Sequence, residues 1–258
     1  MTNALSEARR RIDAEESVVI ATIVDAPSGV GRRLLILSDG TTQGTLGDDE
    51  LDRQAVADAN EQLQAGESKT REYTIDGAQT LIFYDVYAAP DRLLIFGGVH
   101  IAVPLVELAK VLGFRVTVVD ARGQFASEER FPKADEIVIA YADDYLQNAR
   151  LDLSTHVVVL THDPKLDDPA IIHALKRPVR YIGAIGSRRT HAGRVERLKA
   201  AGLSDEQIAK IHAPIGLNIG ARNPEQIALS IVGEMVAAKN GAPTLAREPR
   251  PSKSAVPA

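Results

Sequence analysis

The sequence of 258 residues is 45% hydrophobic and 25% charged with a net charge of −5, which excludes a wholly disordered or fibrous chain and fits one or two globular domains. It contains no cysteine, which excludes a disulfide framework, a thiolate metal site and a cysteine nucleophile. No apolar run approaches the roughly 20 residues of a membrane helix, and the N-terminal residues are charged where a signal peptide is apolar, so we expect a cytoplasmic protein without a membrane span.

The first 90 residues are predicted to form a small α+β domain. Apolar residues recur at helical spacing in two segments, and β-branched runs separated by Asp-Gly turns indicate strands. The predicted elements are a helix at 4–15, a strand at 17–25, a strand segment at 33–47 with a turn at Asp39-Gly40, a helix from Asp48 to Ala65 that stops at Gly66, and a hairpin around Asp76-Gly77. Residues 88–91 are a candidate linker.

Charge is distributed unevenly between the two parts of the chain. Residues 1–90 carry 8 Lys and Arg against 16 Asp and Glu, whereas residues 91–241 carry 19 against 18. An acidic first third is a poor partner for nucleic acid, because nucleic-acid binding depends on neutralising phosphates with Lys and Arg. The second part is the better host for a small anionic ligand.

Residues 91–241 are predicted to form a Rossmann-like domain with a doubly wound parallel sheet. Short, nearly continuous apolar runs begin at five positions, with helix-length segments between them, which indicates parallel strands buried on both faces. The runs begin at Arg92, Arg115, Glu136, His156 and Val179. A last helix is expected after Asn223 as N-cap and Pro224 as first residue. The proline-rich tail, 242–258, is predicted to be disordered.

A glycine-rich turn follows the first strand of this domain. Gly97, Gly98 and His100 occupy the place of a G-x-G-x-x-G/A motif, and Asp120 ends the next strand where an acidic residue binds a ribose. Val99 stands in place of the middle glycine that lets backbone approach a pyrophosphate. Two interpretations remain open, a nucleotide-like ligand at this edge and a tight turn without one. His100 is a candidate donor to an anion, and Asp120 either holds a ribose or caps the strand.

A second candidate is the start of the helix after the Val179 strand. Gly186, Ser187, Arg188 and Arg189 bring backbone N–H groups, a hydroxyl and two guanidinium groups to one point. Such a group of donors suits a phosphate. The alternative is a solvated, basic helix start.

A third candidate is the Gly/Pro-rich loop before the last helix. His212, Gly216 and Gly220 lie in it, and both glycines permit a close approach of backbone to a ligand. The alternative is a packed connection. His162-Asp163 is a weak candidate for a metal pair because no third ligand follows at a recognisable spacing, so no metal site is predicted.

Three segments of the second domain resemble the XdhC/CoxI family, the accessory proteins that mature xanthine dehydrogenase and CO dehydrogenase. They are LLIFGGVHIAVPLVELAKVLGFRVTVVDARGQFASEERFPKADE, YIGAIGSRRTHAGRVERL and IHAPIGLNIGARNPEQIALSIVGEMVA. The resemblance implies a Rossmann-like C-terminal domain and binding of molybdenum cofactor, as molybdopterin or its cytosine dinucleotide. It also implies a molybdenum hydroxylase client, with a sulfurase or a second XdhC-like protein as further partners and a homodimer as the assembly.

The chain departs from the family pattern at two places. The family's turn reads like G-A-G-H-V-A, so Gly97, His100 and Ala102 match while Val99 replaces a glycine. In the first domain, the family's G-x-I-x-G-G-C-x-E corresponds to residues 44–52, where Glu50 stands in place of the cysteine. No role of that cysteine in handling cofactor is possible here.

Spacing alone names no reaction, because the sequence has no nucleophile elbow, HExxH motif, P-loop or persuasive pair of carboxylates. The first hypothesis is therefore a cofactor-binding maturation protein rather than an enzyme, with no catalytic residues. The second is an NAD(P)-dependent oxidoreductase, which the sheet, the glycine turn and Asp120 favour and Val99 disfavours. The third is a regulatory interaction module without a ligand.

Overall fold

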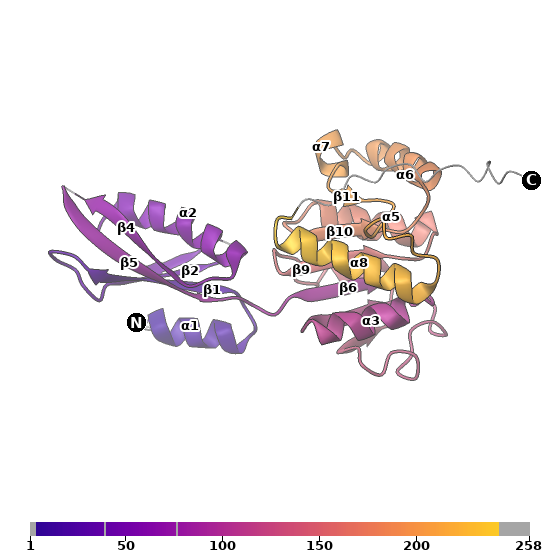
Figure 1. The fold of residues 1–258 in the computed structure, drawn as a ribbon, viewed down its shortest axis with the longest axis horizontal. Helices are drawn as coiled ribbons and strands as arrows, with labels where there is room; N and C mark the ends of the chain where they lie inside the picture. The colour runs from indigo at the N-terminus through magenta and orange to yellow at the C-terminus, as the bar shows by residue number, and fades with distance from the viewer. Residues whose placement is uncertain (1–3, 39, 76, 243–258) are drawn as a thin grey trace, which may run out of the picture. The chain divides into compact units, whose positions relative to one another are not determined.

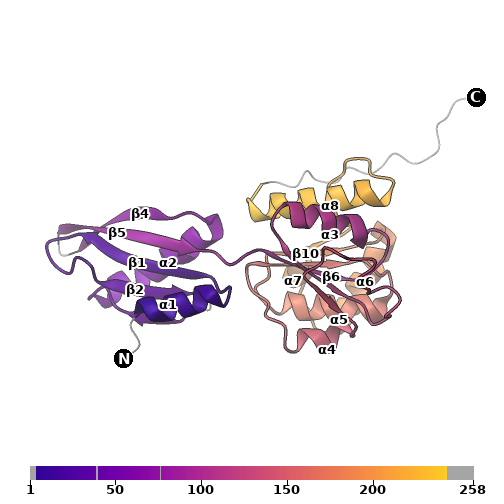
Figure 2. The same cartoon turned by 90° about the horizontal axis from the view of Figure 1, so that it is seen from below.

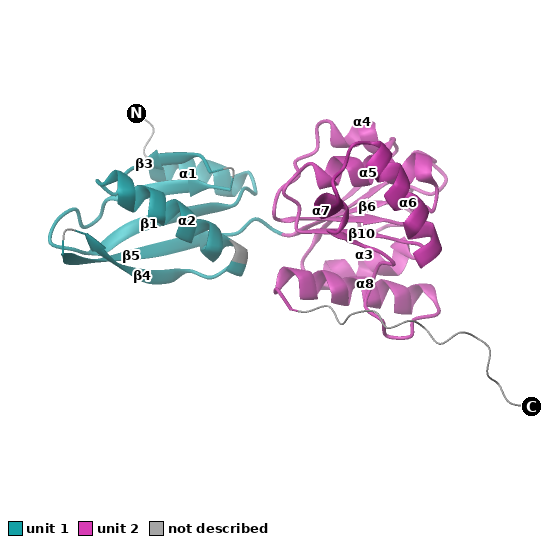
Figure 3. Cartoon of the chain, turned by 90° about the horizontal axis from the view of Figure 1, so that it is seen from above, with its two compact units in different colours: residues 1–90 teal, residues 91–258 magenta. Residues whose placement is uncertain are grey.

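The computed structural model describes residues 4–38, 40–75 and 77–242. Asp39 and Asp76 of the two predicted turns, and residues 243–258 of the predicted disordered tail, lie outside the described residues. The chain divides into two compact units, residues 1–90 and 91–258 (Figure 3).

Unit 1 is an antiparallel sheet with one helix on each face (Figure 1). Its strands, in the order β3-β2-β1-β5-β4, are β1 (Val18–Asp25), β2 (Arg33–Leu37), β3 (Thr42–Gly44), β4 (Lys69–Ile75) and β5 (Ala78–Tyr87). Successive side chains of a strand point to opposite faces. Val18 and Ile20 therefore pack under α1 (Ala4–Asp13), and Val19 and Ala21 pack under α2 (Asp49–Ala65).

Both helices predicted in unit 1, at 4–15 and from Asp48 to Ala65, are confirmed as α1 and α2, and the predicted hairpin is confirmed as β4 and β5. The side chain of Asp48 caps α2 by accepting a hydrogen bond from the Leu51 N–H at 2.7 Å, and Gly66 ends the helix with a φ of 71°. Glu50, at the position of the family's cysteine, lies exposed in the first turn and pairs with Arg53. Carboxylates at a helix N-terminus are stabilised by the helix dipole.

Unit 2 is a parallel sheet with helices on both faces, and the predicted Rossmann-like class is confirmed (Figure 2). Its strands are β6 (Arg92–Phe96), β7 (Arg115–Val119), β8 (Glu136–Val138), β9 (Thr155–Val159), β10 (Tyr181–Ala184) and β11 (Ile211–His212). Its helices are α3 (Ala102–Val111), α4 (Ala142–Leu146), α5 (Pro164–Leu175), α6 (Arg188–Ala200), α7 (Asp205–Ile208) and α8 (Pro224–Lys239).

The strand order, β11-β10-β9-β6-β7-β8, is that of a doubly wound fold, with the order reversing between β6 and β9. The helices α3 and α8 lie side by side on one face, where one apolar cluster joins them to the sheet. A second cluster joins α4, α5 and α6 to the other face. The last helix begins as predicted, with the Asn223 side chain accepting from the Gln226 N–H at 2.9 Å.

Two features of unit 2 differ from the expected pattern. The described chain has no helix between β7 and β8, although that segment has helix length, because Gly123 and Pro132 interrupt it and no apolar face runs through it. The short edge strand β11 lies at the start of the predicted Gly/Pro-rich loop.

Candidate functional site

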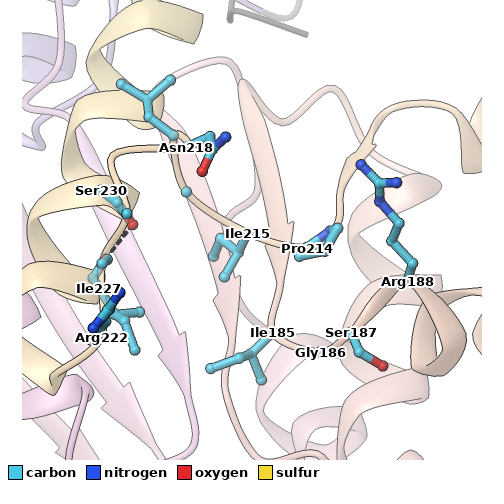
Figure 4. Close-up of a pocket in the computed structure, with 14 residues that line it drawn as sticks. Ile185, Gly186, Ser187, Arg188, Pro214, Ile215, Asn218, Arg222, Ile227 and Ser230 are labelled. Atoms are coloured by element: carbon cyan, nitrogen blue, oxygen red, sulfur yellow. Dashed lines mark hydrogen bonds between the residues drawn. The ribbon is translucent and has the colours of Figure 1, made fainter. Parts of the chain in front are cut away.

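A cavity of about 690 Å³ opens at the carboxyl edge of β10, between the start of α6 and the start of α8 (Figure 4). We call it the α6–α8 cavity. Its lining residues are Ile185, Gly186, Ser187, Arg188, Pro214, Ile215, Gly216, Leu217, Asn218, Gly220, Ala221, Arg222, Ile227 and Ser230. The volume lies in the range of small-molecule sites, and the carboxyl ends of parallel strands are where α/β proteins bind ligands.

The start of α6 forms one side of this cavity. Gly186 has a φ of 142°, and Ser187 caps α6 by accepting a hydrogen bond from the Thr190 N–H at 3.1 Å. The chain therefore turns from β10 directly into the helix, which places Arg188 at the cavity and the helix N-terminus beside it. A helix N-terminus carries partial positive charge and favours anions.

The loop before α8 forms the other side, and a buried carboxylate anchors it. Glu234, only 3% exposed, accepts hydrogen bonds from the Gly216 N–H at 2.7 Å and from the Tyr181 hydroxyl at 2.6 Å. Gly216 has a φ of 88°, and a Cβ there would lie 2.3 Å from Ser230 Oγ. The loop is thus fastened both to the sheet and to α8.

His212 belongs to the support of the loop and does not line the cavity. Its ring lies on that of Tyr181, with 4.6 Å between the ring centroids, and Nδ1 lies 3.5 Å from Glu234 Oε1. Burial alone would raise the pKa of Glu234, but the contacts with His212, Tyr181 and Gly216 hold that pKa below its usual value. Glu234 therefore stays ionised and keeps its hydrogen bonds at neutral pH.

The cavity combines apolar walls with two cationic side chains. Ile185, Pro214 and Ile215 lie between Arg188 and Arg222, which stand on opposite sides (Figure 4). The hydroxyl of Ser230 donates to the Ile227 carbonyl at 2.7 Å, so that hydroxyl proton is already used. Apolar walls between two guanidinium groups suit a ligand that joins an apolar body to negatively charged groups.

The glycine turn after β6 is filled by the protein itself. Both carboxylate oxygens of buried Asp120 accept hydrogen bonds, from the Gly98 N–H at 2.9 Å and from the Arg122 side chain at 2.9 and 2.8 Å. A Cβ on Gly98 would lie 2.1 Å from the carbonyl oxygen of Phe125. The neighbouring cavity has a volume of only about 10 Å³.

These contacts also set the charge of Asp120. Burial would raise the pKa of Asp120, but hydrogen bonds from Arg122 and Gly98 outweigh burial and lower it. Asp120 is therefore an ionised carboxylate that ties the segment between β7 and β8 to the glycine turn. His100 lies exposed in the same turn, ahead of α3.

Apart from His212, which supports the loop before α8, the structure divides the predicted site residues among three places. Gly186, Ser187, Arg188, Gly216 and Gly220 lie around the α6–α8 cavity. The group around the first turn comprises Gly97, Gly98, His100 and Asp120. Arg189 faces a separate cavity between α5 and α6, because consecutive helical residues point about 100° apart.

Sequence reasoning missed two residues that matter to the cavity. Arg222 lines it and directly precedes the N-cap Asn223, so the basic residue at a helix start was a usable signal. Glu234 is the one acidic residue in the apolar run from Ile227 to Ala238, and a charge in such a run indicates a buried partner.

No group of three or more His, Cys, Asp or Glu side chains that could hold a metal occurs among the described residues. His162, in the connection between β9 and α5, has a φ of 65°, and the side chain of Asp163 caps α5 by accepting from the Lys165 N–H at 3.0 Å. Nor is any helix in the described ranges long and apolar enough to cross a membrane.

The strand order and the α6–α8 cavity define a Rossmann-type α/β protein. Residues 93–235 match the family model described as the XdhC Rossmann domain, and residues 11–74 match that of the XdhC and CoxI family. The first match covers more than half of the chain, so this chain belongs to the XdhC and CoxI family. The resemblance inferred from the motifs is confirmed.

Three curated relatives are similar to parts or most of this chain. A protein of Escherichia coli K12 named as uncharacterized protein YqeB is 28% identical over 93% of this chain and 47% of its own length. A probable xanthine dehydrogenase subunit of Bacillus subtilis 168 is 34% identical over 56% of this chain and 42% of its own length. The molybdenum cofactor insertion chaperone PaoD of E. coli K12 is 35% identical over 36% of this chain and 29% of its own length.

The chain therefore spans less than half the length of these curated relatives. Among solved structures, a xanthine dehydrogenase from Bacillus halodurans aligns with a TM-score of 0.54 and 20% identity, over 95% of this chain and 98% of that one. At this identity the alignment establishes the fold.

Proposed function

We propose that this chain binds molybdenum cofactor in the α6–α8 cavity and assists its insertion into a molybdenum hydroxylase of the xanthine or CO dehydrogenase type. The observation that carries the proposal is the cavity of about 690 Å³ with Arg188 and Arg222 on opposite sides of apolar walls. Supporting it are the family membership and the relative named as a cofactor insertion chaperone.

The cargo and the cavity match in chemistry. The cofactor joins a flat pterin to a phosphate, or to a nucleotide diphosphate in its dinucleotide form. Isoleucine walls can pack on the pterin, and arginines form strong charge-assisted hydrogen bonds to phosphate oxygens. Because the sequence has no cysteine, no thiolate of this chain can bind the molybdenum, and we assign binding to contacts with the pterin and the phosphate.

The proposal is tested by identifying the ligand of the purified protein. We expect protein produced in a host that makes molybdenum cofactor to release, after heat and iodine oxidation, a fluorescent pterin in stoichiometric amount. The mass of that pterin distinguishes the form that carries a single phosphate from the dinucleotide form. Arg188→Ala and Arg222→Ala should each lower affinity about tenfold, because each removes a charge-assisted hydrogen bond worth about 1.5 kcal/mol.

The matched control is Arg53→Ala, which removes an exposed arginine of α2 in the other unit. That variant should retain pterin like the unaltered protein. Empty unaltered protein, prepared beside a family relative that emerges loaded, would contradict the proposal. So would equal retention by the Arg188→Ala, Arg222→Ala and Arg53→Ala variants.

A further inference from the structure

A second cavity, of about 290 Å³, lies between the start of α5 and the first turns of α6. We call it the α5–α6 cavity. Arg189, Arg194 and Arg197 line it, together with His162 and Asp167. Nothing in the proposed function uses it, and Arg188, which immediately precedes Arg189, faces the other cavity.

The most informative residue of this cavity is Arg194. Its side chain is only 1% exposed, and Nη2 donates to the Ile185 carbonyl at 3.0 Å and lies 3.3 Å from Asp167 Oδ2. Its Nε and Nη1 have no hydrogen-bond partner among the described residues. Buried donors are nearly always satisfied, and a buried guanidinium with unmet donors is costly. These two nitrogens of Arg194 are therefore donors that can serve an acceptor from outside the described residues.

Asp167 accepts a hydrogen bond from only one nitrogen of Arg194, Nη2. It accepts from the Thr161 hydroxyl and makes the single long contact with Arg194. Burial raises the pKa of Asp167, so its negative charge is held less firmly than that of an exposed aspartate. Arg197 is already paired with Asp168, whereas Arg189 lies exposed at the rim. With Arg197 paired in this way, Arg189 and Arg194 remain against the one buried aspartate of the lining.

The ring of His191, which lies near Arg194, also has a nitrogen without a hydrogen-bond partner among the described residues. Nδ1 of His191 is buried without a hydrogen bond in the described part of the chain. Burial, with a smaller contribution from Arg194, lowers the pKa of His191, so the ring is neutral at pH 7. His191 therefore adds no positive charge to this region, and the arginines supply it.

We propose that the α5–α6 cavity is a binding site for a tetrahedral oxyanion of the phosphate type, with Arg194 at its floor and Arg189 at its rim. A water molecule occupies roughly 30 Å³ of liquid, so the cavity has room for one such anion and several waters. Guanidinium groups match phosphate oxygens in geometry and charge. The phosphate is either a free ion or a group of a larger ligand.

The test uses inorganic phosphate as the probe and follows the thermal unfolding midpoint against chloride at matched ionic strength. It starts from the Arg188→Ala/Arg222→Ala double variant, which removes both arginines of the α6–α8 cavity. We expect phosphate still to raise Tm of this variant, since a ligand of the folded state stabilises it. Adding Arg189→Gln should weaken phosphate binding about tenfold, and adding Arg53→Gln should leave it unchanged.

Two results would overturn the proposal. One is the loss of the phosphate effect in the double variant, which would place the anion in the α6–α8 cavity. The other is an effect that Arg189→Gln does not reduce. Because Arg189 is exposed, its replacement does not threaten folding. Loss of pterin binding leaves this test intact, so the two proposals can fail separately.

The source of the phosphate is settled by a second measurement. If Arg189→Gln also lowers retention of pterin, the site receives the phosphate of the cofactor. If retention of pterin is unchanged while phosphate binding weakens, the site takes a free phosphate. Either result supports an oxyanion site between α5 and α6.

Discussion

At the scale of single residues, the neighbours of several buried ionisable groups determine whether those groups are charged. Glu234 and Asp120 stay ionised because each accepts several hydrogen bonds, and each ties one segment of the chain to another. His156 is the opposite case. Its ring is fully buried and packs edge-on against Phe114, with 5.0 Å between the ring centroids.

His156 makes the stability of the fold depend on pH. Burial lowers the pKa of His156 from its usual 6.5 to about 4, so the folded state binds fewer protons than the unfolded state between these values. The stability due to this group is complete above about pH 6.5 and is lost as the pH falls towards 4. We expect about 3 kcal/mol of the free energy of unfolding to disappear over that range.

Urea unfolding of the unaltered protein and of His156→Leu at several pH values checks this prediction. Glu234 and Asp120, whose pKa values are lowered, also cause acid destabilisation, but they do so in both proteins. The difference between the two curves therefore isolates His156. Parallel pH dependence in the two proteins would show that the expectation is wrong.

At the scale of elements, the loop from β11 to α8 contains two glycines in the left-handed backbone region. One of them also packs closely against α8. Gly216 and Gly220 have φ values of 88° and 73°, so alanine at either position is strained. A Cβ at Gly216 would also lie 2.3 Å from Ser230 Oγ, whereas nothing lies within 4 Å of one at Gly220.

We therefore expect the two alanine variants to differ in stability. Gly220→Ala should cost about 1 kcal/mol, the penalty of a left-handed backbone. Gly216→Ala should cost about 2 kcal/mol more, because the loop must also move away from α8. Denaturant unfolding of both variants measures the two costs side by side, and equal costs would mean that the loop does not rest on α8 as described.

At the scale of the whole molecule, each compact unit has its own apolar interior. Among the described residues, two apolar clusters draw only on residues 1–90 and two draw only on residues 91–242. A unit that buries its own core contains what is needed to fold by itself.

We expect a fragment of residues 91–242 to fold alone. Its urea unfolding should be a single cooperative transition, with a smaller m-value than the full chain because less surface becomes exposed. Circular dichroism and the m-value measure this directly. A fragment without a cooperative transition would show that the parallel sheet depends on residues 1–90.

The sequence by itself determined what depends on neighbours along the chain. Periodicity of apolar residues located most strands and helices, and local caps such as Asp48 and Asn223 fixed where helices begin. The parallel class followed from strands that are apolar throughout, and the family followed from three motifs. The segment between β7 and β8 was the exception, since helix length without an apolar face does not make a helix.

Only the tertiary structure decided which candidate side chains meet. The strand order brings the start of α6 and the start of α8 to one cavity, although Arg188 and Arg222 are far apart in sequence. Helix geometry sends Arg188 and Arg189 to different cavities. The fold brings the Gly98 N–H to the carboxylate of Asp120, 22 residues further along the chain. Such contacts depend on distances across the fold, which one-dimensional spacing does not contain.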